Sequence, residues 1–320
     1  MSGDVPERSG PPLVRVFGAS AEAEKELSAA WPEAQLVTGP ADGPFEAALV
    51  WDCAPEELAD FVDAQPGLRW LHTIAAGMAP AVLARLTGRA RLVLTNGSGT
   101  HGRAVAEHVL ALALAHCKRL PQLLDAQCAR RWQPPHVREL GSMRAGIVGL
   151  GDLGRSTARL LTAFGTEVVG LRRDARPVAE VSATYGPDRL DAFCADLDLL
   201  VVAAPLTPET RALIGRRQLE QLRPGALLVN VGRGPVVDEQ ALLAALRTGR
   251  LSGAALDVFA TEPLPADSPL WSEPGVVITP HCADTSPETD RRCLDLLLDN
   301  IERHRSGRPL RNVVQPGRGY

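Results

Sequence analysis

A glycine-rich turn at residues 149–154 constrains the fold of this chain more than any other feature. The sequence GLGDLG directly follows the apolar segment Ala145–Val148 and opens a segment with helical spacing. In a strand–turn–helix unit, such glycines permit a tight turn, close approach of the backbone to a pyrophosphate, and close packing of helix on strand. The pattern predicts a dinucleotide-binding unit with phosphate at the helix N-terminus. The residues expected to face the cofactor are Gly149, Gly151, Asp152, Leu153 and Gly154.

The end of the next predicted strand indicates which dinucleotide is preferred. The segment Glu167–Leu171 is followed by Arg172 and Arg173, where NAD-binding units usually carry an acidic residue for the adenosine ribose. Arginine side chains at this place suit the 2′-phosphate of NADP(H). The sequence therefore predicts NADP(H) as the preferred cofactor, and NAD(H) remains possible. The plainer alternative is a solvated arginine pair beside Asp174.

Apolar segments alternate with segments of helical spacing along two stretches of the chain. In the first stretch the expected strands are Leu13–Phe17, Ala47–Trp51, Trp70–Ile74 and Arg91–Leu94, with a helix at Pro55–Ala64. In the second they are Ala145–Leu150, Glu167–Leu171, Leu199–Ala204, Ala226–Val231, Ala254–Val258 and Val276–Thr279. The alternation is typical of α/β proteins and predicts two doubly wound parallel sheets. A long helix is expected at Arg103–Gln127 with a break at Pro121, and a final helix from Pro287.

Composition and charge exclude several classes of protein. The 320 residues favour two domains, and the net charge of −4 does not suit a surface that wraps nucleic acid. No apolar run approaches the roughly 18 residues of a membrane helix, so no membrane is expected as a partner. The polar start shows no secretory signal, which predicts a cytoplasmic protein. The six cysteines are scattered without a C-x-x-C pair, which predicts reduced thiols and no metal site.

Scarce lysine and tyrosine exclude one kind of dehydrogenase chemistry. The chain has only Lys25 and Lys118, and only Tyr185 and Tyr320. A Tyr-x-x-x-Lys proton relay therefore cannot be formed anywhere in this sequence. The reaction of short-chain dehydrogenases, which depends on that relay, is excluded.

Three polar segments follow strands of the second stretch, at the edge where open α/β sheets bind ligands. They carry Arg233, then Asp257 and Glu262, and then His281. An arginine, a carboxylate and a histidine in this order resemble the D-isomer-specific 2-hydroxyacid dehydrogenase family. The resemblance covers most of the chain. Further matching segments are the glycine turn, Thr73–Met78, Asn96–His108 and Ala204–Thr210.

The resemblance implies a fold and an activity. A Rossmann cofactor domain, residues 101–284, would be inserted into a flavodoxin-like substrate domain made of residues 1–100 and 285–320. Hydride transfer between the nicotinamide and the 2-carbon would interconvert a small 2-keto acid and a D-2-hydroxy acid. The long helix resembles the dimer-forming element of the family, so a homodimer is expected. Further expected cofactor contacts are Pro205, Val231 and, at the nicotinamide carboxamide, Asp257.

The resemblance also implies a role for each catalytic candidate. His281 would transfer the hydroxyl proton, which suits a side-chain type with an ordinary pKa of about 6.5. Glu262, if it is hydrogen-bonded to His281, would orient the ring and favour the imidazolium form. Arg233 would bind the substrate carboxylate and polarise the carbonyl. Backbone amides around Ala76 and Gly77 would hold the other side of that carboxylate.

The chain departs from the family at two positions. Ala79 stands where an acidic or amide residue is common, which puts the polarity of the preferred substrate side chain in doubt. Asp284 stands where glycine is often found three places after the histidine, and aspartate tolerates left-handed backbone angles better than most residues. Two other functions stay open on the same fold: a dinucleotide-sensing, corepressor-like interaction protein and a phosphite-type dehydrogenase.

Overall fold

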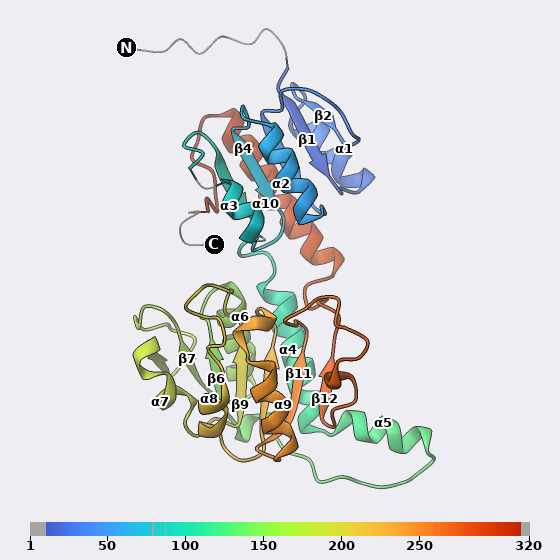
Figure 1. Ribbon diagram of the computed structural model, residues 1–320, viewed down its shortest axis with the longest axis vertical. Coiled ribbons are helices and arrows are strands. Elements are labelled where there is room, and N and C mark those ends of the chain that lie inside the picture. The colour runs from blue at the N-terminus through green and yellow to red at the C-terminus, as the bar shows by residue number, and fades with distance from the viewer. Residues whose placement is uncertain (1–10, 79, 87, 315–320) are drawn as a thin grey trace. The chain divides into compact units, whose positions relative to one another are not determined.

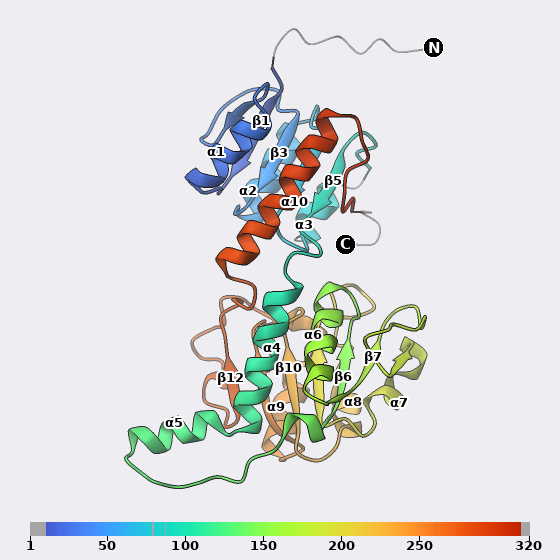
Figure 2. The ribbon, with the colours of Figure 1, turned by 180° about the vertical axis from the view of Figure 1, so that it is seen from behind.

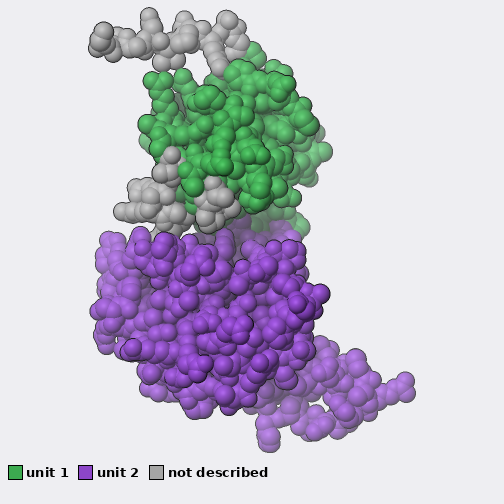
Figure 3. Space-filling view, in the orientation of Figure 1, with its two compact units in different colours: residues 1–100, 287–320 green, residues 101–286 purple. Residues whose placement is uncertain are grey.

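The structure is a computed structural model that describes residues 11–78, 80–86 and 88–314. The chain divides into two compact units, coloured separately in Figure 3. The first unit contains the chain up to Thr100 and from Pro287 onward, and the second unit is His101–Ser286. The chain therefore leaves the first unit and returns to it, with the whole second unit between.

The first unit is built on a parallel five-stranded sheet in the order β2-β1-β3-β4-β5. Helices α1 and α10 share a core with one face, and helices α2 and α3 share a core with the other (Figures 1 and 2). Successive residues of β3 alternate between the two faces, so the strand is apolar throughout, as expected for a parallel sheet covered on both sides. The strands are β1 Leu13–Phe17, β2 Gln35–Val37, β3 Ala47–Val50, β4 Trp70–Thr73 and β5 Val93–Asn96. The helices are α1 Ala21–Ala30, α2 Pro55–Ala64, α3 Pro80–Leu86 and α10 Pro287–Arg305.

The second unit contains a parallel seven-stranded sheet in the order β12-β11-β10-β9-β6-β7-β8. Helices α4 and α6 pack on one face, and α7, α8 and α9 pack on the other. This is the doubly wound order of a dinucleotide-binding fold with one further strand at the β12 edge. The strands are β6 Arg144–Val148, β7 Glu167–Leu171, β8 Ala183–Tyr185, β9 Leu199–Val202, β10 Ala226–Asn230, β11 Leu251–Leu256 and β12 Val276–Ile278. The helices are α4 Gly102–Cys117, α5 Leu120–Cys128, α6 Asp152–Ala163, α7 Leu190–Cys194, α8 Arg216–Gln221 and α9 Glu239–Arg247.

The long helix expected at residues 103–127 is two helices, and the break lies before Pro121 rather than at it. Helix α4 ends at Cys117, and Arg119 adopts a left-handed φ of 55° before α5 begins. A continuous helix would bring the proline ring against the carbonyl of Cys117. That carbonyl instead accepts a hydrogen bond of 3.0 Å from the backbone N–H of Arg138. Helix α5 has no buried residue and extends away from the sheet of the second unit (Figure 2).

Both predicted parallel sheets are confirmed, with some boundaries displaced. The strand expected at Arg91–Leu94 is found at Val93–Asn96, and that expected at Ala254–Val258 is found at Leu251–Leu256. In both cases the hydrogen-bonded register with the neighbouring strands, rather than the apolar run, fixes the ends. Within the described ranges, no helix combines the length and apolar character needed to cross a membrane.

Candidate active site

The glycine turn connects β6 to α6 at the carboxyl edge of the second sheet. Gly149 has a left-handed φ of 95°, and a side chain there would collide with the backbone of Ala203 and Ala204. A Cβ at Gly154 would overlap the carbonyl of Gly149, so only glycine lets α6 begin this close to the strand. A Cβ at Gly151 would meet no described atom within 4 Å, so this residue borders open space at the helix N-terminus. The turn thus fits a pyrophosphate, because the helix N-terminus favours negative charge.

Two residues inside the turn make internal contacts. The Asp152 carboxylate accepts a 2.8 Å hydrogen bond from the backbone N–H of Gly102, the first residue of α4. Leu153 is half-buried and packs on the core beneath α4 and α6. The Asp152 side chain therefore joins the start of α4 to the start of α6, a contact that the sequence does not reveal.

Positive charge gathers at the end of β7. Arg172 Nε lies 3.6 Å from Asp174 Oδ1, and Arg176 Nη2 lies 2.5 Å from Asp174 Oδ2. Hydrogen bonds from Arg176 lower the pKa of Asp174 to about 2, with a smaller contribution from the charge of Arg172. Arg173 is exposed between them. Three arginines against one carboxylate leave a net positive strand end, which suits a phosphate group.

The loops after β9 and β10 lie beside the glycine turn. Pro205 is exposed, and its carbonyl accepts a 2.7 Å hydrogen bond from Thr210 Oγ1. Val231 is buried directly after β10. A Cβ at Gly232 would lie 2.7 Å from the carbonyl oxygen of Ala204, so the two loops touch through their backbones. Pro205 and Val231 therefore occupy neighbouring strand ends next to the turn.

Arg233 is fixed between the ends of β10 and β11. Its carbonyl accepts a 3.3 Å hydrogen bond from Asn230 Nδ2, and Asn230 Oδ1 accepts one of 3.1 Å from Gly232. Gly234 packs directly against the backbone of Phe259, where a side chain would collide. Arg233 Nη1 donates to the carbonyl of Gly232 at 2.7 Å. Because a guanidinium has five N–H donors in a planar fork, this internal bond engages only a part of its capacity.

The buried carboxylate of Asp257 holds the loop after β12. Asp257 is 1% exposed. Its Oδ1 accepts hydrogen bonds from Thr279 Oγ1 at 2.5 Å and from the Cys282 N–H at 3.0 Å, and its Oδ2 accepts one from the Ala283 N–H at 3.2 Å. His108 Nε2, on α4, lies 3.1 Å from Thr279 Oγ1 and 3.7 Å from Asp257 Oδ1. Asp257 therefore organises the segment that carries His281.

His281 and Glu262 form a histidine–carboxylate pair. His281 Nδ1 lies 2.7 Å from Glu262 Oε2, while Glu262 Oε1 accepts a 2.9 Å hydrogen bond from the Phe259 N–H. The backbone of His281 has a left-handed φ of 50°, and its N–H donates to the carbonyls of Asp257 at 2.8 Å and Thr279 at 3.1 Å. The imidazole side chain is 47% exposed. Because Nδ1 is directed at the carboxylate, a ligand would have to contact this ring through Nε2.

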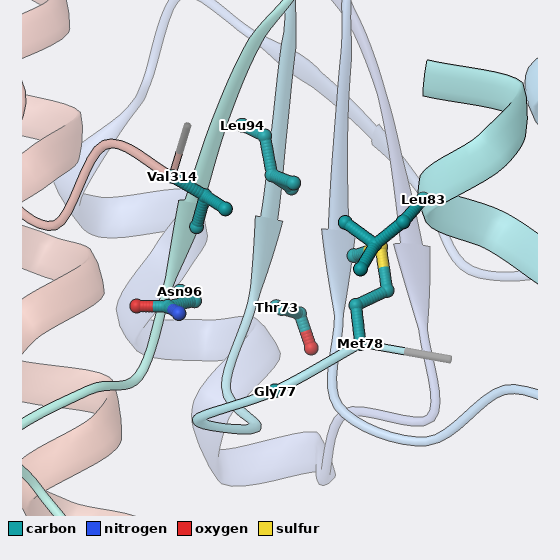
Figure 4. Close-up of a pocket in the computed structure, with 7 residues that line it drawn as sticks. All are labelled: Thr73, Gly77, Met78, Leu83, Leu94, Asn96 and Val314. Carbon is teal, nitrogen blue, oxygen red and sulfur yellow. The ribbon is translucent and has the colours of Figure 1, made fainter. Parts of the chain in front are cut away.

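Ala76 and Gly77 lie in the first unit, in the loop after β4. Asn96 Nδ2 donates a 2.8 Å hydrogen bond to the carbonyl of Ala76, so the end of β5 holds this loop in place. Gly77 borders a small pocket, shown in Figure 4, whose polar side chains are Thr73 and Asn96. The remaining residues of the pocket are Met78, Leu83, Leu94 and Val314. Ala79, one of the two departures from the family pattern, lies outside the described residues.

The fold brings most of the expected residues to one edge of the second sheet. The glycine turn, Arg233, the Asp257–Glu262 segment and His281 follow β6, β10, β11 and β12, whose carboxyl ends share that edge. Sequence reasoning missed His108 and Thr279 as supports of Asp257. It also missed a pair between His101 and Asp284, although Asp284 was marked as unusual. The described residues contain no cluster of His, Cys, Asp or Glu suited to a metal ion.

Comparisons with known proteins agree with this arrangement. The family model for the D-isomer specific 2-hydroxyacid dehydrogenase NAD-binding domain matches residues 110–283. The chain is 33% identical over 285 residues to glyoxylate/hydroxypyruvate reductase A of Yersinia enterocolitica, covering 87% of this chain and 88% of that protein. It is 35% identical over 264 residues to glyoxylate/hydroxypyruvate reductase B of Pectobacterium carotovorum, covering 80% and 82%.

Solved structures give the same result over nearly the whole chain. A D-isomer specific 2-hydroxyacid dehydrogenase from Xanthobacter autotrophicus Py2, in complex with NADPH and MES, superposes with a TM-score of 0.83 at 35% identity, covering 98% of this chain and 100% of that one. The NADPH-dependent glyoxylate/hydroxypyruvate reductase of Sinorhizobium meliloti, in complex with NADP and sulfate, gives a TM-score of 0.84 at 30% identity, covering 97% and 100%. The chain therefore belongs to the D-isomer specific 2-hydroxyacid dehydrogenase family.

Proposed function

We propose that this protein is an NADP(H)-preferring 2-keto acid reductase that interconverts a small 2-keto acid and the corresponding D-2-hydroxy acid. The observation that carries the proposal is the 2.7 Å contact between His281 Nδ1 and Glu262 Oε2, at the same sheet edge as the glycine turn. A histidine held by a carboxylate beside a dinucleotide site is equipped to transfer a proton during a hydride transfer. The similar reductases named above act on glyoxylate and hydroxypyruvate, which are small 2-keto acids.

The residues of the second unit fit a bound dinucleotide phosphate. Gly151 borders open space at the N-terminus of α6, where its backbone would approach the pyrophosphate. Arg172 and Arg173 would bind the 2′-phosphate, and two similar solved structures contain NADPH or NADP. Pro205 and Val231 would line the cofactor between these two points, and the Asp257 segment would face the nicotinamide end. Bound NADPH would supply the hydride that reduces the 2-keto carbon.

The chain itself would supply the proton and bind the acid. His281 would give the Nε2 proton to the carbonyl oxygen in reduction and take it back in oxidation. Glu262 would keep Nδ1 protonated and the ring in place. Arg233 would bind the substrate carboxylate through its planar fork of donors. The amides of Ala76 and Gly77 would bind the same carboxylate.

The two units would have separate tasks. The second unit would be the dinucleotide-binding domain and the first unit the substrate domain, and the second division between the units, at 286/287, lies two residues beyond the boundary expected from the sequence. A cytoplasmic location fits the cysteines, since all six are free thiols, as is usual in a reducing compartment.

A homodimer is supported by the exposed apolar side chains around α5. Leu120 and Leu124 are 46% and 52% exposed, and Trp132 in the following segment is fully exposed. No residue of α5 is buried, although six of its nine residues are apolar or small. Exposed apolar groups gathered on one projecting element are typical of an interaction surface. A second copy of this chain would cover them.

The test is cofactor oxidation with NADPH and NADH in parallel, against glyoxylate, hydroxypyruvate, pyruvate, phenylpyruvate and a branched 2-keto acid. We expect turnover with NADPH that falls by about 10²- to 10⁴-fold in His281→Ala, which loses the proton donor. His136→Gln, at an exposed position, is the matched control and should keep full activity. Tight NADPH binding without turnover of any acid would contradict the proposal and favour the dinucleotide-sensing alternative.

A further inference from the structure

A second histidine–carboxylate pair lies in the loop that carries His281. His101 Nδ1 is 3.0 Å from Asp284 Oδ2. The His101 side chain is 8% exposed and the Asp284 side chain 41%. His101 directly precedes α4, and Asp284 is three residues beyond His281, so the pair connects the start of a helix to the end of the catalytic loop.

Each residue of the loop from 281 to 284 has an anchor. The N–H of His281 binds the Asp257 carbonyl, and the N–H groups of Cys282 and Ala283 bind the Asp257 carboxylate. Asp284, the last of the four, contacts His101 instead. Asp257 directly follows β11 and His101 directly precedes α4, so two separate parts of the fold hold this loop in position.

The charges around the loop affect the protonation of both members of the His101–Asp284 pair. Hydrogen bonding to His101 lowers the pKa of Asp284 below its usual range, and the charge of His281 acts in the same direction. Asp284 is therefore ionised near neutral pH, and its charge favours a proton on the His101 ring. The titratable or charged groups that face the loop from the packed elements are Glu262 and Asp257 after β11, His101 and His108 on or beside α4, and Asp152 at Gly102.

We propose that His101 is a positioning residue for the proton transfer at His281, because its pairing with Asp284 fixes the catalytic loop and offsets the second negative charge beside the ring. The inference depends on the proposed function, in which His281 is the proton donor. Without His101, both Glu262 and an unpaired Asp284 would act on His281. Two carboxylates would hold the imidazolium proton more tightly than Glu262 alone.

The first test is the pH dependence of kcat/KM for 2-keto acid reduction in three variants. His101→Gln keeps a hydrogen-bond donor toward Asp284 and removes the positive charge, so the limb on which activity falls with rising pH should move upward by about 0.5 to 1 pH unit. Adding Asp284→Asn removes the unpaired carboxylate, so the double variant should return to within about 0.2 pH unit of the wild type. Asp284→Asn alone should leave the limb unchanged or shift it slightly downward.

The outcomes separate an electrostatic role from a merely structural one. An unchanged limb in His101→Gln would overturn the proposal, even if kcat fell. An upward shift that persists in the double variant would also overturn it, since the unpaired Asp284 charge would then not be the cause. His136→Gln is the matched control, because it removes an exposed histidine and should leave the profile unchanged.

A second measurement does not depend on enzyme activity. The ¹⁵N chemical shifts of the imidazole nitrogens report the charge of each ring, and the wild-type chain has seven histidines to assign. We expect a protonated His101 ring at pH 7.5 in the wild type, and a neutral ring would overturn the proposal. A failure of the proposed function can be told apart from a failure of this inference. If the protein reduces no 2-keto acid, the proposed function fails. If in that case the His101 ring is charged and His281 titrates at higher pH in His101→Gln, the electrostatic effect of His101 on His281 is still supported.

Discussion

Acid should destabilise the first unit through one buried histidine, His72 on β4. Its side chain is 0% exposed, and Nδ1 lies 2.8 Å from Thr95 Oγ1. Trp70 Nε1 donates to the same hydroxyl oxygen at 2.9 Å, so Thr95 is the shared partner of both rings and only Nε2 of His72 lies outside this contact. Among the described residues, none is a hydrogen-bond partner for that Nε2. A charged ring at this place would be desolvated without a counter-charge.

The size of the loss in unfolding free energy follows from the difference between the pKa of His72 in the unfolded and in the folded chain. Burial lowers the pKa of His72 from 6.5 to about 3. The unfolded chain therefore binds a proton below about pH 6.5 that the folded protein does not accept until about pH 3. The free energy of unfolding should decrease as the pH falls through this window, by about 2 kcal/mol at pH 5 and by about 3 kcal/mol at pH 4 from His72 alone.

Urea unfolding followed by tryptophan fluorescence at pH 7.5 and pH 5.0 measures this effect. Trp31 and Trp70 are buried in the first unit, whereas Trp132 and Trp271 are 100% and 54% exposed. The change in fluorescence should therefore report mainly the unfolding of the first unit. The quantity to compare is the loss of unfolding free energy between the two pH values, in the wild type and in His72→Leu.

We expect the pH-dependent loss in His72→Leu to be smaller than in the wild type by about 2 kcal/mol. The difference between two pH values cancels the constant cost of the substitution itself. His304 also has a lowered pKa, because its ring packs against Trp31 and Trp70 and is partly desolvated there, so some pH dependence should remain in the variant. His136→Gln should behave like the wild type. Equal losses in wild type and His72→Leu, within about 0.5 kcal/mol, would refute the reasoning.

Further predictions concern the cofactor site, the His281–Glu262 pair, the proposed dimer surface and the stability of the second unit. Arg173→Ala should raise the KM for NADPH by about tenfold or more and change that for NADH by less than twofold, because a charge-assisted phosphate contact contributes about 1.5–3 kcal/mol; equal effects on both cofactors would contradict this role. Glu262→Gln should lower kcat by about 10²-fold with little change in substrate KM, and an unaltered kcat would remove Glu262 from the mechanism. Leu124→Glu should convert the proposed dimer into a monomer in light scattering, and an unchanged mass would exclude the α5 surface as its interface. Asp198→Asn should lower the free energy of unfolding of the second unit by about 2 kcal/mol, since Arg138, Arg223 and the N–H of Arg144 all bind this buried carboxylate; calorimetry measures the loss.

Sequence patterns predicted the elements that carry a clear apolar run or a clear apolar helix face. Strands β1 and β7 and helix α2 were predicted with their observed ends, because an apolar run or an apolar helix face stops at polar or turn-forming residues. The short edge strands β2 and β8 were missed. Each has three residues, none fully buried, so neither shows an apolar run or a regular alternation. Their strand conformation depends on pairing with β1 and β7, which is not a local property of the sequence.

In the candidate site too, the sequence indicated which residues matter but not which distant residues they contact. Glycine spacing selected Gly149, and strand ends together with the resemblance to the family selected Arg233, Glu262 and His281 as candidates. The links of Asp152 to Gly102 and of His101 to Asp284 were not predictable, because both depend on where α4 begins relative to other elements. Sequence spacing contains no such information for partners 50 or more residues apart.

The orientation of His281 shows why its chemistry is a property of the sheet order. A histidine in a loop has two ring nitrogens, and the sequence does not say which one faces a substrate. Here β11 pairs with β12 in parallel, with Leu256 opposite Ile278. Asp257 and Thr279, the residues that follow these two, therefore lie side by side at the ends of neighbouring strands. The carbonyls of both residues fix the left-handed backbone of His281, and the loop after β11 returns Glu262 to Nδ1. Nε2 is therefore the ring nitrogen turned away from Glu262 because β11 and β12 are neighbours, and a change in either strand end would misplace the proposed proton donor without altering the histidine itself.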